Sequence, residues 1–118
     1  MTYRQFLVPT EDEILDAIGS YPGATEGDPN VRTFDLASGA GDSVNISYDI
    51  PGRSFRVEIR SGDAIRIDLL RESATRLNVT SADQTVRVQV EFQADDLSGV
   101  LEIAVGSTVV MNDRLLMI

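Results

Sequence analysis

The sequence contains no cysteine, histidine, tryptophan or lysine, so all ten of its basic residues are arginines. Without cysteine there is no disulfide, no thiolate nucleophile and no sulfur-ligated metal. Without histidine and lysine there is no imidazole base, no Schiff base and no Ser-His or Ser-Lys pair. Carboxylates are the only side chains left for acid–base catalysis. These absences predict a protein that is not an enzyme and that needs no cofactor.

Acidic residues are in excess and are unevenly distributed along the 118 residues, whose formal net charge is −9. Residues 1–50 contain nine carboxylates and two arginines, whereas residues 51–118 contain ten carboxylates and eight arginines. A negative surface repels phosphate backbones and anionic lipids. It attracts basic proteins and speeds their encounter. We therefore expect a basic protein partner and neither nucleic acid nor membrane.

Long apolar runs are also missing. Near the N-terminus only Phe6-Leu7-Val8 are consecutively apolar, and near the C-terminus the longest run is Leu115–Ile118. A secretory signal requires roughly 7 to 15 apolar residues, and a membrane-spanning helix about 20. The expected location is the cytoplasm.

One helix is predicted, over residues 10–19 or so. Thr10 and Glu13 have the spacing of a capping box, in which each side chain accepts a hydrogen bond from the other residue's backbone N–H. Ile14 and Ile18 fall on one face, and Gly19 suits the left-handed position that ends a helix. Residues 20–30 contain Pro22, Gly23, Gly27 and Pro29 and are expected to form a loop.

From about residue 31 to residue 118, apolar residues alternate with polar ones, which is typical of β-strands with one buried face. The clearest runs are Val44, Ile46, Tyr48 and Ile50; Phe55, Val57 and Ile59; Ile65, Ile67 and Leu69; Val86, Val88, Val90 and Phe92; and Leu101, Ile103 and Val105. Short turns join them, so the strands are antiparallel. We expect a single α+β domain over residues 1–118, with a meander of about seven strands.

One short helix covers only three or four strands, so the predicted sheet curls strongly around it. A closed β-barrel or a β-sandwich is the alternative. For the last strand, roughly Thr108 to Ile118, a break at Asn112-Asp113 is an open possibility.

Pairing the apolar residues also predicts strand registers. Val57 opposite Ile67 places Glu58 opposite Arg66 and Arg56 opposite Asp68, which are favourable charge pairs. In the preceding hairpin, Tyr48 opposite Val57 places Asp49 opposite Arg56. Later in the chain, a turn at Ser98-Gly99 and Phe92 opposite Leu101 place Glu91 opposite Glu102.

The acidic N-terminal segment is the principal candidate for binding a partner. No basic residue lies between Arg4 and Arg32, and Tyr21 supplies an aromatic side chain among the charges. Aromatic residues are frequent anchors in protein interfaces. The alternative is a solvated helix face and loop with no partner. The candidate partner-binding residues are Glu11, Asp12, Glu13, Asp16, Tyr21, Glu26 and Asp28.

A second acidic patch is expected around Glu91, Asp95, Asp96 and Glu102. Two glutamates facing each other are unfavourable unless a metal or a partner's arginine lies between them. A carboxylate pair or a Mg²⁺ or Ca²⁺ site is the enzyme alternative for these residues. A different register, or side chains spreading into water, would equally remove the repulsion, and our prediction includes no metal.

In size, acidity, lack of catalytic groups and helix-plus-sheet layout, the chain resembles the immunity proteins of bacterial polymorphic-toxin and contact-dependent inhibition systems. The resemblance is one of overall character and rests on no motif. It implies a cytoplasmic protein that binds a cognate toxin, often a basic nuclease, and masks its active site or substrate groove. The alternatives are a small-molecule carrier or sensor with a ligand inside the curled sheet, and a carboxylate- or metal-dependent hydrolase. A homodimer through an edge strand is also possible.

Overall fold

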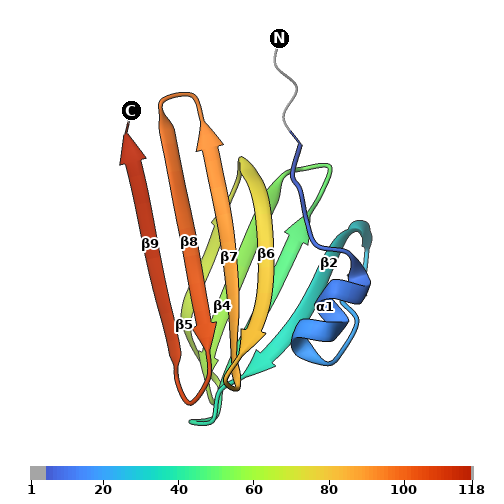
Figure 1. Ribbon diagram of the computed structural model, residues 1–118, viewed down its shortest axis with the longest axis vertical. Helices are drawn as coiled ribbons and strands as arrows, with labels where there is room; N and C mark the ends of the chain where they lie inside the picture. Colours follow the sequence, from blue (N-terminus) through green and yellow to red (C-terminus); the bar gives the residue numbers. More distant parts are fainter. Residues whose placement is uncertain (1–4, 118) are drawn as a thin grey trace.

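The computed structural model of the protein describes residues 5–117, which form one helix and nine strands. The elements are α1 (Glu11–Ile18), β1 (Gly23–Thr25), β2 (Asp28–Ala37), β3 (Asp42–Asp49), β4 (Ser54–Ser61), β5 (Ala64–Arg71), β6 (Ala74–Ala82), β7 (Thr85–Ala94), β8 (Leu97–Val105) and β9 (Val109–Met117). Figure 1 shows the long strands running along the molecule, with α1 at one side.

Helix α1 begins and ends where the local signals predict. The capping box is present: the Glu13 backbone N–H donates to Thr10 Oγ1 at 3.1 Å, and the Thr10 backbone N–H donates to Glu13 Oε1 at 3.0 Å. Gly19 ends the helix in the left-handed conformation, with φ of 85°. Ile14 is fully buried and attaches the helix to the core.

The prediction of a single curled sheet of about seven strands is wrong. The nine strands form two antiparallel sheets, one in the order β1-β2-β3-β4-β5 and one in the order β6-β7-β8-β9, and the described strands do not close into a barrel. Two features explain the error. The chain leaves the first sheet at Ser73, whose positive φ of 67° interrupts the extended backbone. The segment expected to be a loop also contains β1, which pairs with β2 although it has no alternating apolar residues.

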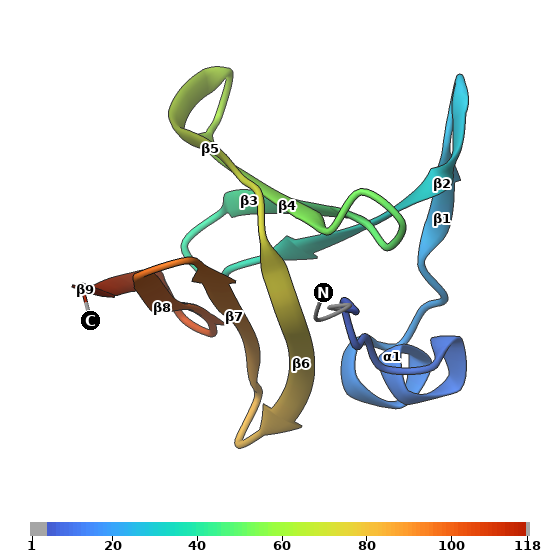
Figure 2. The ribbon, with the colours of Figure 1, turned by 90° about the horizontal axis from the view of Figure 1, so that it is seen from above.

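The two sheets face each other across a shared apolar core (Figure 2). Val44, Ile46 and Val57 from the first sheet and Leu101 and Ile103 from the second are fully or almost fully buried and belong to one cluster. Helix α1 lies beside β6, and thereby covers the part of the five-stranded sheet that the four-stranded sheet does not reach. Both layers therefore depend on one hydrophobic core.

The segment before α1 covers the edge of β6. The Leu7 backbone N–H donates to the Thr75 carbonyl at 2.9 Å, and the Leu77 backbone N–H donates to the Leu7 carbonyl at 2.8 Å. Phe6, the preceding residue, is buried in the core. This short parallel contact occupies backbone groups of β6 that would otherwise face outward.

The predicted registers are wrong by two residues in all three hairpins. The observed partners are Tyr48 with Phe55, Val57 with Leu69, and Val90 with Leu101. Wherever the shift is two residues, a side chain stays on its predicted face, because the side-chain period of a strand is two. Most inward-facing residues were therefore predicted correctly even though their partners were not. Ile65 and Ile50 are exceptions: Ile65 lies beyond the irregularity, faces Arg60 and is 53% exposed, and Ile50 is 40% exposed.

The turn between β7 and β8 explains one of these errors. It is formed by Asp95 and Asp96, with Ala94 opposite Leu97, and not by Ser98-Gly99. Asp95 has a φ of 49°, a conformation that aspartate tolerates better than most residues. Gly99 lies inside β8, where a Cβ atom would stand 2.8 Å from the Arg114 carbonyl oxygen. Here glycine permits close approach of β9.

The hairpin of β4 and β5 turns at Gly62-Asp63 and contains a register irregularity beside Arg60. Glu58 therefore faces Asp68 and not Arg66, and Arg56 faces Leu70. In the hairpin of β3 and β4, Asp49 faces Ser54 in place of Arg56. The last strand, β9, is continuous through Asn112-Asp113, so the possible break there is absent.

Candidate protein-docking surfaces

The exposed side of α1 carries most of the predicted partner-binding residues. We define the helix surface as Glu11, Asp12, Glu13, Asp16 and Tyr21, all of which are exposed. The Tyr21 hydroxyl donates to Asp12 Oδ1 at 3.0 Å, so the ring is held against the helix while 57% of the residue stays accessible. The next residue, Pro22, is buried and secures the chain at this point.

The four carboxylates of the helix surface are not equivalent. Glu13 is engaged in the capping box, and the hydrogen bond from the Thr10 backbone lowers the pKa of its carboxyl group. Glu11 lies 3.5 Å from the Arg32 guanidinium, which partly neutralises it. Asp16 makes no hydrogen bond or ion pair with any residue of the described chain. Asp12 and Asp16 are therefore the carboxylates most available to an incoming cation.

Glu26 and Asp28 lie apart from the helix surface. Glu26 lies in the turn between β1 and β2, and Asp28 is the first residue of β2; Figure 2 shows this hairpin extending away from α1. The Asp28 carboxylate accepts from the Asn30 backbone N–H at 3.0 Å and so helps to shape the start of β2. The seven predicted partner-binding residues thus form two separate acidic groups.

The second predicted patch is largely neutralised. Glu91 lies opposite Val100, not Glu102, so the expected repulsive pair does not form. Instead Arg76 Nε lies 3.7 Å from Glu91, and Arg87 Nη1 donates to Glu102 Oε1 at 3.2 Å. Asp95 and Asp96 form the neighbouring turn. No group of three or more carboxylates in residues 5–117 is arranged to hold a metal ion.

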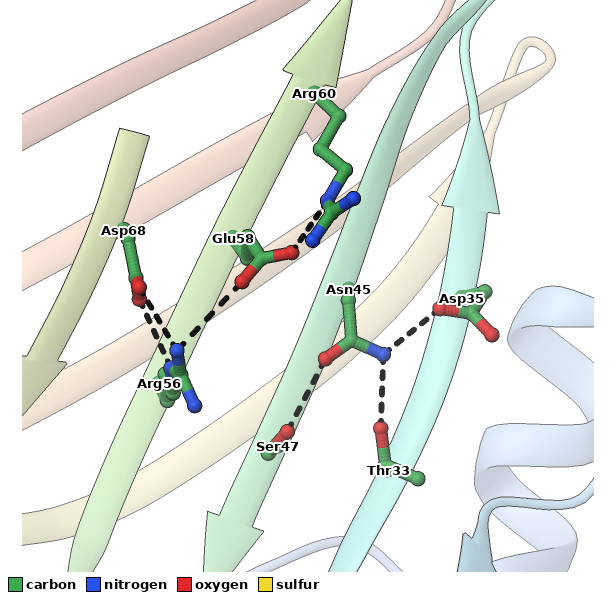
Figure 3. A network of polar contacts seen from close by, with 8 residues as sticks. All are labelled: Thr33, Asp35, Asn45, Ser47, Arg56, Glu58, Arg60 and Asp68. Atoms are coloured by element: carbon green, nitrogen blue, oxygen red, sulfur yellow. Dashed lines mark hydrogen bonds and ion pairs between the residues drawn. The ribbon is translucent and has the colours of Figure 1, made fainter. Parts of the chain in front are cut away.

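The outer face of the five-stranded sheet holds a polar network that no sequence pattern predicted as a whole (Figure 3). The outer-face network consists of Thr33, Asp35, Asn45, Ser47, Arg56, Glu58, Arg60 and Asp68. Asn45 on β3 is the central residue of the part of the network that joins β2 to β3. Its Nδ2 donates to Asp35 Oδ1 at 2.8 Å and to Thr33 Oγ1 at 3.0 Å, and its Oδ1 accepts from the Ser47 hydroxyl at 3.3 Å.

On β4 and β5 the network is ionic. Arg56 donates to both carboxylate oxygens of Asp68, at 2.9 and 2.8 Å, while Arg60 Nε donates to Glu58 Oε1 at 2.6 Å. Arg56 also lies 3.6 Å from Glu58, so the facing pair Glu58 and Asp68 is bridged by one guanidinium. The hydrogen bonds from Arg56 lower the pKa of the Asp68 carboxyl group. The result is a surface of nearly balanced charge with ordered side chains.

An ion pair joins the two sheets between β5 and β9. Arg71 donates to both carboxylate oxygens of Asp113 at 2.7 Å, and its guanidinium carbon lies 5.1 Å from the centre of the Phe92 ring. The hydrogen bonds from Arg71 lower the pKa of the Asp113 carboxyl group. We call this pair the inter-sheet clasp. Nothing in the local sequence indicates it, because its residues lie on different sheets.

Apolar side chains gather along β9, where the four-stranded sheet ends. Val110, Leu115 and Leu116 are respectively 52%, 49% and 66% exposed. On the outer face of the same sheet a shallow hollow is lined by Gln89, Val100, Glu102, Asn112 and Arg114. The combination of an open strand edge, exposed leucines and a polar hollow distinguishes this part of the surface.

Comparisons with known proteins relate the chain to one described assembly. No known family profile matches the sequence, and no curated protein shows significant sequence similarity to it. A chain in a solved structure described as a contact-dependent growth inhibition toxin–immunity protein complex from Klebsiella pneumoniae 342 is similar in fold, with a TM-score of 0.78 and 15% identity. The match covers 93% of this chain and 96% of that chain. Within the described residues, the structure has no helix that could span a membrane.

Proposed function

We propose that this chain is an immunity protein that binds a cognate toxin in the cytoplasm and blocks it without catalysis. The observation that carries the proposal is the fold shared, over nearly the full length of both chains, with a component of a toxin–immunity complex. That complex contains two kinds of protein, and the absence of histidine, lysine and cysteine favours the inhibitor role for this one.

The helix surface is the proposed contact with the toxin. Asp12 and Asp16 present charge with little internal compensation, and Tyr21 offers an exposed aromatic ring held in place by Asp12. A preorganised aromatic side chain loses little conformational entropy on binding and often dominates interface energy. The net charge of −9 increases the rate of encounter with a basic toxin. Glu26 and Asp28 extend the acidic surface to the hairpin of β1 and β2.

Inhibition would follow from occupation of the toxin's cationic surface. Carboxylates placed against a groove that normally binds phosphate would pair with its basic side chains and exclude the substrate. Such contacts are weakened by salt because they are largely electrostatic. The proposed mechanism requires no proton transfer by this chain, and the carboxyl groups of Glu13, Asp68 and Asp113 have lowered pKa values, opposite to those of a general acid.

The carrier and hydrolase alternatives receive less support. The inward-facing rows that would line a ligand cavity pack as one apolar cluster from both sheets. The carboxylates proposed for hydrolysis lie in separate ion pairs or in a turn.

The direct test is co-expression with the product of the neighbouring gene. We expect a complex that survives purification at low salt, dissociates as salt rises, and protects cells from growth arrest by that product. A toxic neighbour that neither binds this chain nor is neutralised by it would contradict the proposal.

Charge reversal then tests the helix surface. Asp12→Arg with Asp16→Arg is expected to weaken the complex about 100-fold at low salt, because attraction is replaced by repulsion at two central positions. The matched control is Asp63→Arg with Glu72→Arg, which makes the same change in net charge at exposed sites away from α1. Equal weakening by both pairs would show a general charge effect and exclude the helix surface as the docking site.

A further inference from the structure

Three of the four outermost strands of the two sheets are protected against pairing with another chain. Strand β1 has only three residues and an irregular register with β2. Strand β5 has a register irregularity beside Arg60 that leaves Arg66 without a partner on β4. The start of strand β6, from Thr75 to Leu77, is covered by the segment around Leu7. Short length, irregularity and covering segments are the usual ways in which proteins prevent edge-to-edge association.

Strand β9 has none of these protections. It pairs with β8 through nine consecutive residues, Leu97 with Met117 to Val105 with Val109, without an irregularity. No described residue pairs with its other edge, because β9 is outermost in the order β6-β7-β8-β9. Val110, Leu115 and Leu116 are exposed along it. A long, regular edge is a template for strand addition, and on β9 exposed apolar residues flank a polar centre, Asn112-Asp113-Arg114.

We propose that β9 is a homodimer interface, in which β9 of a second copy pairs antiparallel with it around a two-fold axis at Asp113. The outer faces of the two four-stranded sheets then join into one surface. Val110 faces Leu116 of the second copy, and Leu116 faces Val110 of the second copy. Each exposed apolar side chain of the outer face thereby meets another apolar side chain.

Neighbouring registers fit less well. An axis at Arg114 sets two arginines against each other, and an axis at Asn112 sets Val110 against Arg114. Like charges and apolar–charged pairs at facing positions are unfavourable. The axis at Asp113 does set two aspartates opposite each other. Each carboxylate, however, already accepts hydrogen bonds from Nη1 and Nη2 of its own Arg71, both at 2.7 Å. The centre therefore contains two closed ion pairs.

Arg114 supplies a charged contact with the second copy, near Glu102, which in its own chain is paired with Arg87. The Arg114 side chain makes no hydrogen bond or ion pair with any described residue of its own chain. In the proposed register it faces Asn112 of the second copy, whose pairing partner on β8 is Glu102. These two residues line the shallow hollow on the outer face. The guanidinium of each chain can thus lie over the polar hollow of the other.

Sedimentation measurements on the purified chain test the dimer. The expected mass at high concentration is about twice 12.9 kDa. Val110→Lys with Leu116→Lys places lysine opposite lysine twice and is expected to raise the dissociation constant of the dimer about 100-fold. The control is Ile65→Lys with Leu70→Lys on β5, which changes two equally exposed apolar residues and should leave the dimer intact.

Disulfide cross-linking tests the register and uses conservative changes. The chain has no native cysteine, so Val110→Cys with Leu116→Cys should yield a covalent dimer on mild oxidation. Directly opposed residues have Cα atoms about 4.5 to 5.5 Å apart, within the disulfide range. Val110→Cys alone, or combined with Arg114→Cys, should not cross-link.

A chain that stays monomeric at its highest attainable concentration overturns the proposal, as does a dimer abolished by the β5 variant and not by the β9 variant. A third outcome also rejects the dimer: the wild-type chain is monomeric, and the β9 variant is monomeric too but no longer binds the neighbouring gene's product. The edge of β9 would then be the binding site for that other protein. Should the lysine variant fail to fold, shown by loss of its circular dichroism signal, the cysteine variants decide. Since the dimer is measured on the isolated chain, its outcome is independent of the proposed immunity function.

Discussion

The outer faces of the two sheets use the same residue types to different effect. On the five-stranded sheet, Glu58 is shared by Arg56 and Arg60, and Asn45 joins β2 to β3, so the side chains hold one another in position. On the four-stranded sheet, Arg76–Glu91 and Arg87–Glu102 are separate, exposed pairs. Connected networks give order, whereas isolated surface pairs contribute little. Arginine and carboxylate content alone therefore does not reveal which face is preorganised.

Truncation of core side chains should have the largest effect on the free energy of unfolding. Unlike the outer faces, the cores of the two sheets should respond alike. Leu101→Ala on β8 and Ile46→Ala on β3 each create a cavity at a fully buried site. We expect each to lower the free energy of unfolding by about 3 kcal/mol. Urea denaturation followed by circular dichroism measures this. Both variants should unfold in one transition because the sheets share a core, and separate transitions would contradict that.

The inter-sheet clasp comes next. Arg71→Met keeps much of the contact with Phe92 but removes the bidentate ion pair, and we expect a loss of about 1 to 2 kcal/mol at pH 7. The pKa of Asp113 is lowered in the folded state, so the clasp stabilises the protein above the unfolded pKa of about 4 and ceases to do so as pH falls through the lower folded value.

Urea titrations of the wild type and Arg71→Met from pH 7 to pH 2 measure this dependence, at concentrations where both are monomeric. The difference between them should be constant above about pH 5 and disappear in acid. A difference that persists unchanged at low pH would assign the effect to packing and not to the ion pair.

Removal of the centre of the outer-face network should have the smallest effect. Asn45→Ala deletes the hydrogen bonds to Thr33, Asp35 and Ser47, and we expect a loss of about 1 kcal/mol. Its counterpart is Asn78→Ala on the outer face of β6, where the side chain makes no contact of this kind with the described residues. Equal changes in thermal stability would show that the network contributes no more than an ordinary surface residue.

Local signals predicted part of this structure and could not predict the rest. The helix was predictable because Thr10, Glu13 and Gly19 act within a few residues of one another. Most core-facing residues were predictable because strand alternation survives a register error of two, whereas Ile65 was not, because a one-residue irregularity at Arg60 turns it outward. The division into two sheets was not, since it depends on the backbone of Ser73 and on packing between distant strands.

The candidate sites show the same limit. Tyr21 and Asp12 were proposed from composition, and the structure brings them into contact. Whether they bind a partner stays a prediction. The Glu91–Glu102 pair was wrong because the turn at Asp95-Asp96 sets the register. The inter-sheet clasp and the open edge of β9 depend on which strands lie at the ends of the sheets, and no sequence period reports that.

The contact between Leu7 and β6 affects the order in which parts of the chain can fold during synthesis. Residues around Leu7 leave the ribosome well before Thr75 and Leu77, to whose backbone groups they bind. The nascent chain must therefore keep Phe6 and the apolar side of α1 without their final neighbours until β6 has emerged. Contacts between such distant positions close slowly. In the growing polypeptide, the segment around Leu7 thus reaches its final contacts only after β6 has been made.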